Sequence, residues 1–192
     1  MTLFGHATAA GTDRYRQRFL DKTPEAHFRR SQDLWFSSIG IGTYLGNPDA
    51  VTDAEYHRAI VRAVESGCNV IDSAINYRFQ RSERSVGRAV KELSSKGFNR
   101  NEIIVATKGG FIPYDGDPPK DPRHYFEETF VRPGIASLTD VVGGSHCMTP
   151  AYLQNQLESS LGNLGLDCID IYYIHNPEFQ LGELGPQEFS ER

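Results

Sequence analysis

The chain has 192 residues, of which 39% are hydrophobic and 23% are charged, and its 20 Lys and Arg residues against 25 Asp and Glu residues give a formal net charge of −5. This balance is typical of a soluble globular protein, so we expect neither a disordered tail nor a fibrous repeat nor a membrane protein. A mildly acidic chain is also a poor candidate for nucleic-acid binding, because affinity for phosphate backbones depends on clustered positive charge.

The three cysteines, Cys68, Cys147 and Cys168, are odd in number and show no CxxC spacing. They therefore predict neither a disulfide framework nor a metal site, and we interpret them as inert thiols. No run of residues approaches the roughly 18 consecutive apolar residues of a membrane-spanning helix. Residues 1–33 are polar, carry no apolar signal-peptide core and are interpreted as a lead-in segment with few core residues, so the expected location is cytoplasmic.

After the lead-in, the chain shows a strand, a helix and a second strand. Residues 34–43 form an apolar run broken by glycines, which predicts a strand or short hairpin. A helix is expected to begin at Thr52, because its spacing from Glu55 matches a capping box, and to end before Gly67. Residues 68–72 then predict a short buried strand that ends on a carboxylate.

Two further helix–strand units follow. A helix is predicted from Ser82, and residues 102–108 predict a buried strand that ends on a lysine. A third helix is predicted at Thr149 with Pro150 as its first residue, where the fixed φ of proline fits. Residues 168–175 predict a strand that ends on a histidine. The order β-α-β-α-β-α-β is typical of an α/β fold with a parallel sheet and right-handed crossovers.

Residues 109–148 form a long connection rich in glycine, proline and aromatic residues. Loops of that length in a compact domain are functional or disordered. We expect an ordered insertion that lies over the end of the sheet and shapes a substrate pocket, because its aromatic side chains supply apolar area for packing. The alternative is a solvated surface excursion.

Ionisable side chains follow three of the predicted strands. Asp72, Lys108 and His175 each stand at a strand end, and Tyr77 comes five residues after Asp72. Each residue alone has an ordinary structural explanation, but the carboxyl ends of parallel strands meet at one edge, where these groups would share a concave site. The first βα turn lacks the G-x-G-x-x-G pattern, which argues against a doubly wound dinucleotide-binding sheet.

Five motifs together resemble the aldo-keto reductases, and the resemblance covers residues 34–178 apart from the insertion at 109–148. One departure is local, since Arg78-Phe79-Gln80 stands where the family often has glycine after the tyrosine. The motifs are Gly40-x-Gly42-Thr43, Asn69-Val70-Ile71-Asp72-Ser73-Ala74-x-x-Tyr77, Ser82-Glu83-x-x-Val86-Gly87, Ala106-Thr107-Lys108 and Ile171-Tyr172-Tyr173-Ile174-His175-x-Pro177.

The resemblance implies an oxidoreductase that reduces aldehydes or ketones to alcohols, or runs the reverse reaction. Tyr77 would be the general acid and base, and Lys108 would lower its pKa, which is otherwise about 10. Asp72 would pair with Lys108, and His175 would donate a hydrogen bond that orients the carbonyl. A nicotinamide must supply the hydride, because no side chain can.

The resemblance also implies a cofactor and its contacts. The expected cofactor is NADP(H), with NAD(H) as the alternative. Gly42, Thr43, Tyr44 and Asp72 would bind it, and no metal is expected. Tyr44, Tyr77 and His175 would contact the small-molecule substrate.

The length conflicts with a complete barrel of this family. A (β/α)8 barrel takes about 250 residues, whereas only 17 residues follow His175. We therefore expect the first half of a (β/α)8 TIM barrel, truncated after its fourth strand, with residues 179–192 as the start of the next connection. Such a chain alone would be inactive and would need the missing C-terminal half or a second copy to complete the cofactor site.

Two other functions stay open. Lys108 could be the nucleophile of a Schiff-base aldolase, with Tyr77 as proton shuttle. The chain could also be a non-catalytic half barrel that acts as a binding or regulatory subunit.

Overall fold

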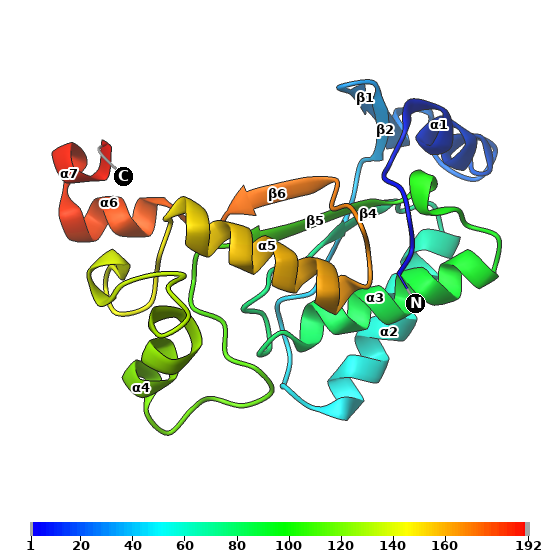
Figure 1. Cartoon of the computed structure of the whole chain (residues 1–192). Helices are drawn as coiled ribbons and strands as arrows, with labels where there is room; N and C mark the ends of the chain where they lie inside the picture. Colours follow the sequence, from blue (N-terminus) through cyan, green and yellow to red (C-terminus); the bar gives the residue numbers. More distant parts are fainter. Residues whose placement is uncertain (1, 191–192) are drawn as a thin grey trace.

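A computed structural model describes residues 2–190 of the chain. Its centre is a parallel sheet of four strands in chain order, which are β3 (Ile41–Gly42), β4 (Val70–Asp72), β5 (Ile104–Gly109) and β6 (Ile171–Ile174) (Figure 1). The predicted α/β fold with a parallel sheet is confirmed.

The register of this sheet aligns the strand ends. Gly42 pairs with Asp72, and Asp72 pairs with Ala106. Lys108 pairs with Tyr173 on the next strand. The carboxyl ends of the strands therefore bring the predicted ionisable groups to one edge.

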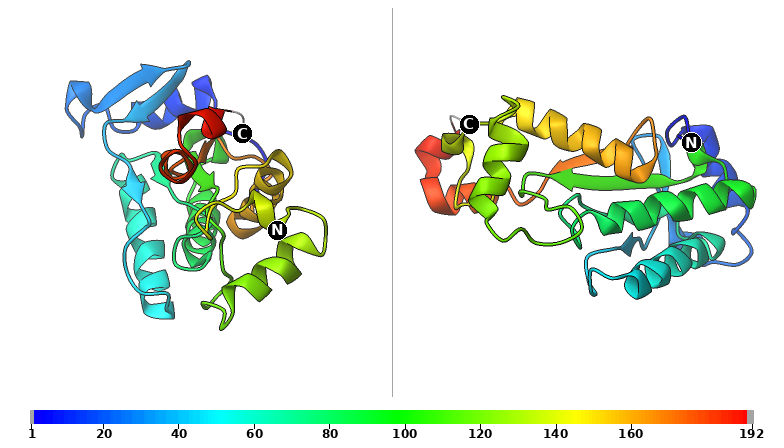
Figure 2. Two further views of the ribbon diagram at one scale, coloured as in Figure 1. Left: turned by 90° about the vertical axis from the view of Figure 1, so that its left-hand side faces the viewer. Right: turned by 60° about the horizontal axis from the view of Figure 1, so that its bottom comes forward.

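Three long helices cover one face of the sheet (Figures 1 and 2). They are α2 (Ala50–Glu65), α3 (Arg81–Ser95) and α5 (Pro150–Leu164). Their apolar stripes and the strands bury one hydrophobic core, which is the dominant favourable contribution to folding. Its fully buried members include Ile60, Val64, Ile71, Val86, Leu93, Ile103 and Val105.

The predicted start of the first helix is wrong by a few residues. The N-cap of α2 is Asp49, whose carboxylate accepts a hydrogen bond from the backbone N–H of Thr52 at 2.8 Å. A carboxylate is as good a cap as a hydroxyl, and Asp49 comes first in the chain. The start of α5 at Thr149 with Pro150 as first residue is confirmed.

The other predicted boundaries also differ from the observed ones by a few residues. Helix α3 begins at Arg81, and Glu102 ends a 3-10 turn (Arg100–Glu102) rather than starting a strand. Strand β6 begins at Ile171. Just before it, Asp170 donates its backbone N–H to the backbone oxygen of Val105 at 3.2 Å, and its side chain accepts the backbone N–H of Val105 at 2.7 Å.

The N-terminal segment contains more core residues than its polar composition predicts. It forms α1 (Ala9–Gln17), a short 3-10 turn (Glu25–His27), and β1 (Phe28–Ser31), which pairs with β2 (Leu34–Ser37) as an antiparallel hairpin (Figure 1). Tyr15 and Phe28 lie buried in the main core. The expectation of few core residues is therefore wrong, because a small number of aromatic rings supply large buried areas.

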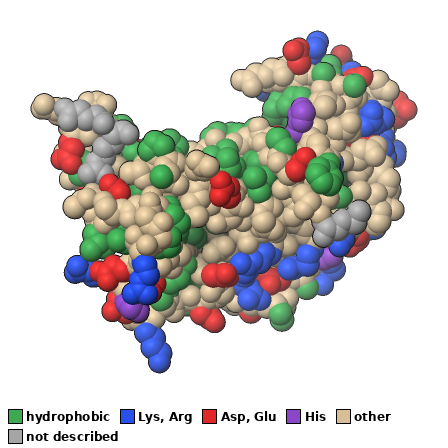
Figure 3. Space-filling view, in the orientation of Figure 1, with side chains coloured by type: hydrophobic (Ala, Val, Ile, Leu, Met, Phe, Trp, Pro, Cys, Tyr) green, Lys and Arg blue, Asp and Glu red, His purple; other side chains and the backbone are tan. Residues whose placement is uncertain are grey.

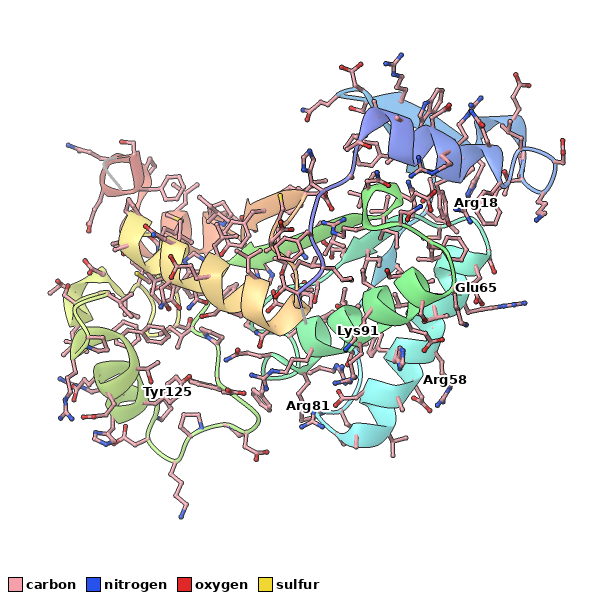
Figure 4. All side chains as sticks on the ribbon, turned by 45° about the vertical axis from the view of Figure 1, so that its right-hand side comes forward. Arg18, Arg58, Glu65, Arg81, Lys91 and Tyr125 are labelled. Atoms are coloured by element: carbon pink, nitrogen blue, oxygen red, sulfur yellow. The ribbon has the colours of Figure 1, made fainter. Side chains whose placement is uncertain are left out.

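The long connection between β5 and α5 is ordered and has a small core of its own. It contains α4 (Pro122–Phe126), a π-helical turn (Glu127–Val131) and a 3-10 turn (Leu138–Asp140). Figure 4 labels Tyr125 within α4. The segment packs beside the carboxyl ends of the strands, near α6 (Glu178–Leu184) and α7 (Pro186–Ser190) (Figure 1). Its buried residues Phe126, Phe130 and Cys147 form a cluster with Tyr152 of α5. The alternative prediction for this segment, a solvated surface excursion, is therefore wrong.

Hydrophobic and basic side chains gather on different parts of the surface in one view. Hydrophobic side chains gather along the concave upper side between the N-terminal hairpin and the C-terminal helices, and Lys and Arg side chains gather below (Figure 3). Arg58 on α2 and Arg81 and Lys91 on α3 are labelled on that basic side (Figure 4). Within residues 2–190, no helix is long and apolar enough to cross a membrane.

Candidate active site

An ion pair lies at the carboxyl edge of the sheet. Nζ of Lys108 is 2.8 Å from both carboxylate oxygens of Asp72 and donates to the carbonyl oxygen of Ser73 at 2.7 Å. The lysine side chain is 16% exposed and the aspartate side chain 40% exposed. These acceptors compensate the lysine side chain for the water that it loses on burial.

Tyr77 lies against this pair. Lys108 Nζ donates to the Tyr77 hydroxyl at 3.5 Å and lies 5.0 Å from the centre of its ring. The Tyr77 ring makes edge contacts with Tyr44 at 4.9 Å and with His175 at 5.5 Å between ring centres. One cation therefore contacts both the carboxylate and the phenol, as the sequence predicts.

His175 follows β6 directly and completes the group. Its Nδ1 lies 3.1 Å from the amide oxygen of Asn76, and its ring meets the edge of Phe111 at 5.2 Å. Burial, followed by the charge of Lys108, lowers the pKa of His175 to about 4. The imidazole is therefore neutral at neutral pH.

Two adjoining hollows open over these residues. One of 370 Å³ is lined by Tyr77, Lys108 and His175. The other, of 410 Å³, shares Tyr77 and His175 and adds Tyr44 and Asn76. Sites for small molecules are concave and carry a few convergent polar groups, which describes this edge of the sheet.

A further cavity lies away from this edge of the sheet. It measures 590 Å³, lies within the insertion, and is lined mainly by apolar residues such as Ile112, Phe126 and Val141. None of the four predicted catalytic residues lines it. The ionisable groups rather than cavity volume therefore mark the candidate active site.

The residues predicted to bind a cofactor differ in accessibility. Gly42 has open space where a side chain would be, next to its partner Asp72. Tyr44 is 64% exposed. Thr43 is buried, and its hydroxyl lies 3.1 Å from the carbonyl oxygen of Asp72 and 3.0 Å from the Ser73 hydroxyl. Gly42, Tyr44 and the half-exposed carboxylate of Asp72 are thus accessible to a bound molecule, while the Thr43 side chain links the strand ends.

The loop after Tyr77 adopts a strained conformation. Arg78, Phe79 and Gln80 have φ angles of 47°, 56° and 68°. Residues with a side chain disfavour this left-handed region, whereas glycine adopts it without strain. The loop also holds the insertion, because Phe79 accepts the backbone N–H of Gly116 at 3.2 Å and Gln80 donates to the carbonyl oxygen of Tyr114 at 3.3 Å.

The Arg78 side chain compensates for that strain. It is buried, with its guanidinium 3.0 Å from the Asp53 carboxylate and 4.8 Å from the ring centre of Tyr56, both on α2. It also donates to the Ser82 hydroxyl at 3.1 Å and to the backbone oxygen of Asn47 at 3.2 Å. The arginine therefore ties the tyrosine loop to α2, to α3 and to the loop after β3.

Comparison with known proteins identifies the family. The profile described as the Aldo/keto reductase family matches residues 38–184. The chain belongs to the aldo/keto reductase family. This aldo/keto reductase is 34% identical over 143 residues to the aldo-keto reductase yakc of Schizosaccharomyces pombe, whose name specifies NADP(+). It is 29% identical over 151 residues to the NADH-specific methylglyoxal reductase of Escherichia coli.

The fold agrees with this assignment. The holo form of an aldo-keto reductase from Bacillus halodurans superposes with a TM-score of 0.53 at 27% identity, covering 77% of this chain and 39% of that one. The chain thus has a fold of the (β/α)-barrel type. The two curated relatives are each matched over 74% of this chain, which spans 33% of the yeast protein and 39% of the bacterial one.

The sequence identified the four ionisable residues but not the residues that hold them in place. Nothing in the local pattern distinguishes Asn76 beyond its place immediately before Tyr77. His146, in the insertion, is fully buried, and its Nε2 lies 2.7 Å from the backbone oxygen of His175. The separation of 29 positions between the two histidines leaves no spacing signal, so only the tertiary structure reveals the contact.

Proposed function

We propose that this aldo/keto reductase transfers hydride between a nicotinamide cofactor and a small carbonyl compound or alcohol, with Tyr77 as general acid and base. The observation that carries the proposal is the position of Lys108 Nζ, which contacts both the Asp72 carboxylate and the Tyr77 hydroxyl. The profile match and the oxidoreductase relatives support the same chemistry.

Tyr77 would move the proton. Reduction of a carbonyl creates negative charge on its oxygen, and a group that donates a proton there lowers the barrier. The phenol lies on the floor of both hollows, where a substrate oxygen can reach it. In the reverse direction, the tyrosinate would take the proton of the alcohol.

Lys108 and Asp72 would control the charge at Tyr77. The ammonium stabilises the phenolate that remains once the proton has left, because opposite charges attract strongly in a partly desolvated site. Asp72 pairs with the ammonium and fixes its direction through both carboxylate oxygens. His175 would orient the substrate on the opposite side of the hollow.

The nicotinamide would supply the hydride to the carbonyl carbon. The residues proposed to hold it are Gly42, Tyr44 and Asp72, with Thr43 bracing them from below. We propose NADP(H) as the cofactor, supported by the yeast relative, with NAD(H) as the alternative supported by the NADH-specific bacterial relative.

We further propose that strands β3 to β6 correspond to the first half of a (β/α)8 barrel. The chain spans 33% to 39% of the two relatives named above, which supports this correspondence. Contacts to the rest of the cofactor would then come from further βα units or from a second copy. A fluorescence titration of the 192-residue chain with NADPH should show no binding, and micromolar binding would count against the half-site.

The same contacts disfavour the Schiff-base aldolase. A nucleophilic lysine must be neutral, whereas Lys108 is enclosed by the Asp72 carboxylate and the carbonyl oxygen of Ser73. Reduction with borohydride in the presence of a carbonyl substrate should therefore leave Lys108 unmodified. Trapping of the substrate on Lys108 would favour the aldolase.

Replacement of the proposed acid tests the reductase. Tyr77→Phe removes one hydroxyl and should lower kcat for NADPH-dependent carbonyl reduction by about 10²- to 10⁴-fold, the typical contribution of general acid catalysis. The measurement is the decrease in NADPH absorbance, in the form of the protein that binds the cofactor.

Tyr56→Phe is the matched control, because its ring stacks on Arg78 and lies outside both hollows. It removes the same hydroxyl and should keep wild-type turnover. Normal turnover by Tyr77→Phe would refute the assignment of the acid. A full-length protein that never oxidises NADPH with any aldehyde or ketone would favour a binding or regulatory subunit.

A further inference from the structure

The three residues after Tyr77 hold a backbone conformation that they do not favour by themselves. Arg78, Phe79 and Gln80 have φ angles of 47°, 56° and 68°, in the left-handed region that penalises a Cβ atom. Such a conformation persists only where the surrounding structure enforces it. Arg78 is held from the side of α2, so Phe79 and Gln80 must be held by other contacts.

Three consecutive residues of the insertion supply contacts of this kind, and we call residues 114–116 the docked segment. The carbonyl oxygen of Tyr114 accepts from the Gln80 side-chain amide at 3.3 Å, and its ring centre lies 6.3 Å from that of Phe79. Gly116 donates its backbone N–H to the carbonyl oxygen of Phe79 at 3.2 Å. The backbone of the insertion therefore holds the loop at two successive residues.

An ion pair anchors the middle of the docked segment. The Asp115 carboxylate lies 2.7 Å from the guanidinium of Arg84 on α3, the helix that begins directly after the loop. This hydrogen bond lowers the pKa of Asp115, which is therefore charged at neutral pH. Asp115 lines neither hollow of the candidate active site, so its contacts are with the protein rather than with a molecule bound there.

The amide of Asn163 on α5 joins the two contacts. Its Oδ1 accepts from Arg84 Nε at 3.0 Å, and its Nδ2 donates to Gln80 Oε1 at 2.9 Å. A guanidinium can only donate, which fixes the orientation of the Asn163 amide. The carbonyl oxygen of Tyr114 can only accept, which fixes that of Gln80 in the same way. Donors and acceptors therefore match along the whole series of contacts.

The contact that carries the proposed function depends on the position of this loop. Lys108 Nζ and the Tyr77 hydroxyl are 3.5 Å apart, close to the upper limit for a hydrogen bond. A contact of that length is too weak to hold the phenol by itself. Because Tyr77 directly precedes the loop, a small displacement of the loop would separate the two groups.

We propose that the docked segment positions Tyr77, with Gln80 and Asp115 as the positioning residues that hold the loop and thereby keep the phenol beside Lys108. The insertion thus contributes to turnover through this contact as well as covering the end of the sheet. Its effect on turnover rests on the proposed function, whereas the docking and its effect on the phenol do not.

Amide hydrogen exchange of the chain measures the docking without cofactor. The protection factor of the Gly116 amide reports its bond to Phe79 and is corrected for the neighbouring side chains. Asp115→Asn should lower this factor about two- to fivefold, the weight of one exposed ion pair. Gln80→Leu removes two hydrogen bonds and should lower it about tenfold.

Asp117→Asn is the matched control, because it removes the same charge from an exposed side chain two positions further along the insertion. It should leave Gly116 protected. Sodium chloride at about 1 M screens the ion pair and tests it without a substitution. The salt should lower the protection factor in the wild type but not in Asp115→Asn. A protection factor that both Asp115→Asn and Gln80→Leu leave unchanged would overturn the docking.

The position of the phenol is measured through Lys108. Because its Nζ lies 5.0 Å from the centre of the Tyr77 ring, the ring should shift the proton signal of the adjacent CH2 group away from those of exposed lysines such as Lys91. Lys108→Arg assigns the signal. The double variant Gln80→Leu/Asp115→Asn should move the signal toward that of the exposed lysines. A signal that stays in place although protection is lost would overturn the positioning of Tyr77.

Kinetics in the cofactor-bound form separate positioning from substrate binding. The double variant Gln80→Leu/Asp115→Asn should lower kcat for carbonyl reduction about tenfold, less than the roughly 100-fold cost of a 1 Å misplacement. Its KM for the carbonyl compound should stay unchanged, and Asp117→Asn should keep both wild-type values. A raised KM with unchanged kcat would overturn the proposal, because it would show that the docked segment contributes to substrate binding instead.

The two proposals fail separately. Normal turnover by Tyr77→Phe would remove the proposed function, while the exchange rates and the lysine signal still decide whether the docked segment holds the loop and the phenol. A protein in which Tyr77→Phe abolishes turnover but the double variant keeps the wild-type kcat retains the proposed function and loses the positioning role of the insertion.

Discussion

The two ends of the central sheet each carry an aspartate paired with a basic residue, and the two pairs differ in every other respect. At the carboxyl end, Lys108 and Asp72 have side chains that are 16% and 40% exposed. At the amino end, Arg100 and Asp170 are 5% and 3% exposed, with 2.7 Å between Nη2 and the carboxylate.

The amino-end pair is closed by the backbone. Asp170 accepts from the N–H groups of Ala7 at 2.6 Å and Val105 at 2.7 Å, while Arg100 donates to the carbonyl oxygens of Ile103 and Cys168. The N-terminal segment covers this end, and Arg18 on the same side (Figure 4) binds the buried Glu102 at 3.0 Å.

The carboxyl-end pair instead contacts a phenol in an open hollow. The difference shows how one kind of ion pair serves two purposes. A pair whose remaining hydrogen-bonding groups meet backbone atoms is structural, whereas a pair that keeps one face toward a cavity and a titratable neighbour is arranged for chemistry.

Removal of the buried carboxylate should have the largest effect on stability. Asp170→Ala leaves the Arg100 charge buried without a counter-ion and leaves two N–H groups without an acceptor, so the free energy of unfolding should fall by about 3 to 5 kcal/mol. Urea denaturation followed by circular dichroism measures it. Asp167→Ala, which removes one exposed hydrogen bond to the Gly5 N–H, is the control and should cost far less. Equal losses in both variants would contradict the structural role of the amino-end pair.

Near the carboxyl end of the sheet, Arg78 differs from the partly exposed Lys108–Asp72 pair. Its side chain is buried, and it pairs with Asp53. Arg78→Ala should cost about 2 kcal/mol, less than loss of Asp170, since Asp53 keeps Arg81 at 2.8 Å and no buried charge is left alone. Thermal unfolding measures the change. Arg78→Gly should be less destabilising than Arg78→Ala, because glycine adopts φ of 47° without strain. The reverse order would show that the loop is not strained.

Removal of the half-exposed carboxylate should barely affect folding. Asp72→Ala should change the free energy of unfolding by about 1 kcal/mol or less, as expected of a solvent-screened pair. The same variant should lose carbonyl reduction in the cofactor-bound form. A stability loss as large as that of Asp170→Ala would remove the distinction between the two ends of the sheet.

The smallest expected effect is a loss of folding stability at acidic pH, which arises at the carboxyl end of the sheet. The pKa of His175 is about 4 in the folded protein against an ordinary value of 6.5. The unfolded chain therefore binds a proton first, and the folded state loses stability as pH falls from about 6.5 toward 4. Half-exposure of the ring screens this effect. His175→Gln should lose less stability than wild type between pH 7 and pH 4.5 in urea titrations, and identical losses would contradict the shift.

Much of the fold could be predicted because local patterns are strong here. The helix begun by Thr149 and Pro150 and ended by Gly165, and the short apolar strands, follow from capping and burial rules that act over a few residues. The N-terminal core could not be predicted, because Tyr15 and Phe28 stand in polar surroundings in the sequence and join a core whose other members come mostly from distant segments.

The sequence by itself determined which ionisable groups come together. Parallel strands must end at a common edge, so a carboxylate, a lysine and a histidine at three successive strand ends converge whatever the details of packing. The family motifs around them add the tyrosine. The length of 192 residues shows only that the chain is shorter than its relatives.

Only the tertiary structure decided which aspartate faces a cavity, which side chain contacts the ring of His175, and how Arg78 stabilises a left-handed loop. Each depends on atoms brought together from different elements. Asp170 is closed by an N–H from the N-terminal segment, His175 receives Asn76 from the loop after β4, and Arg78 meets Asp53 on α2. Contacts of this kind arise from close packing in three dimensions, which no local pattern records.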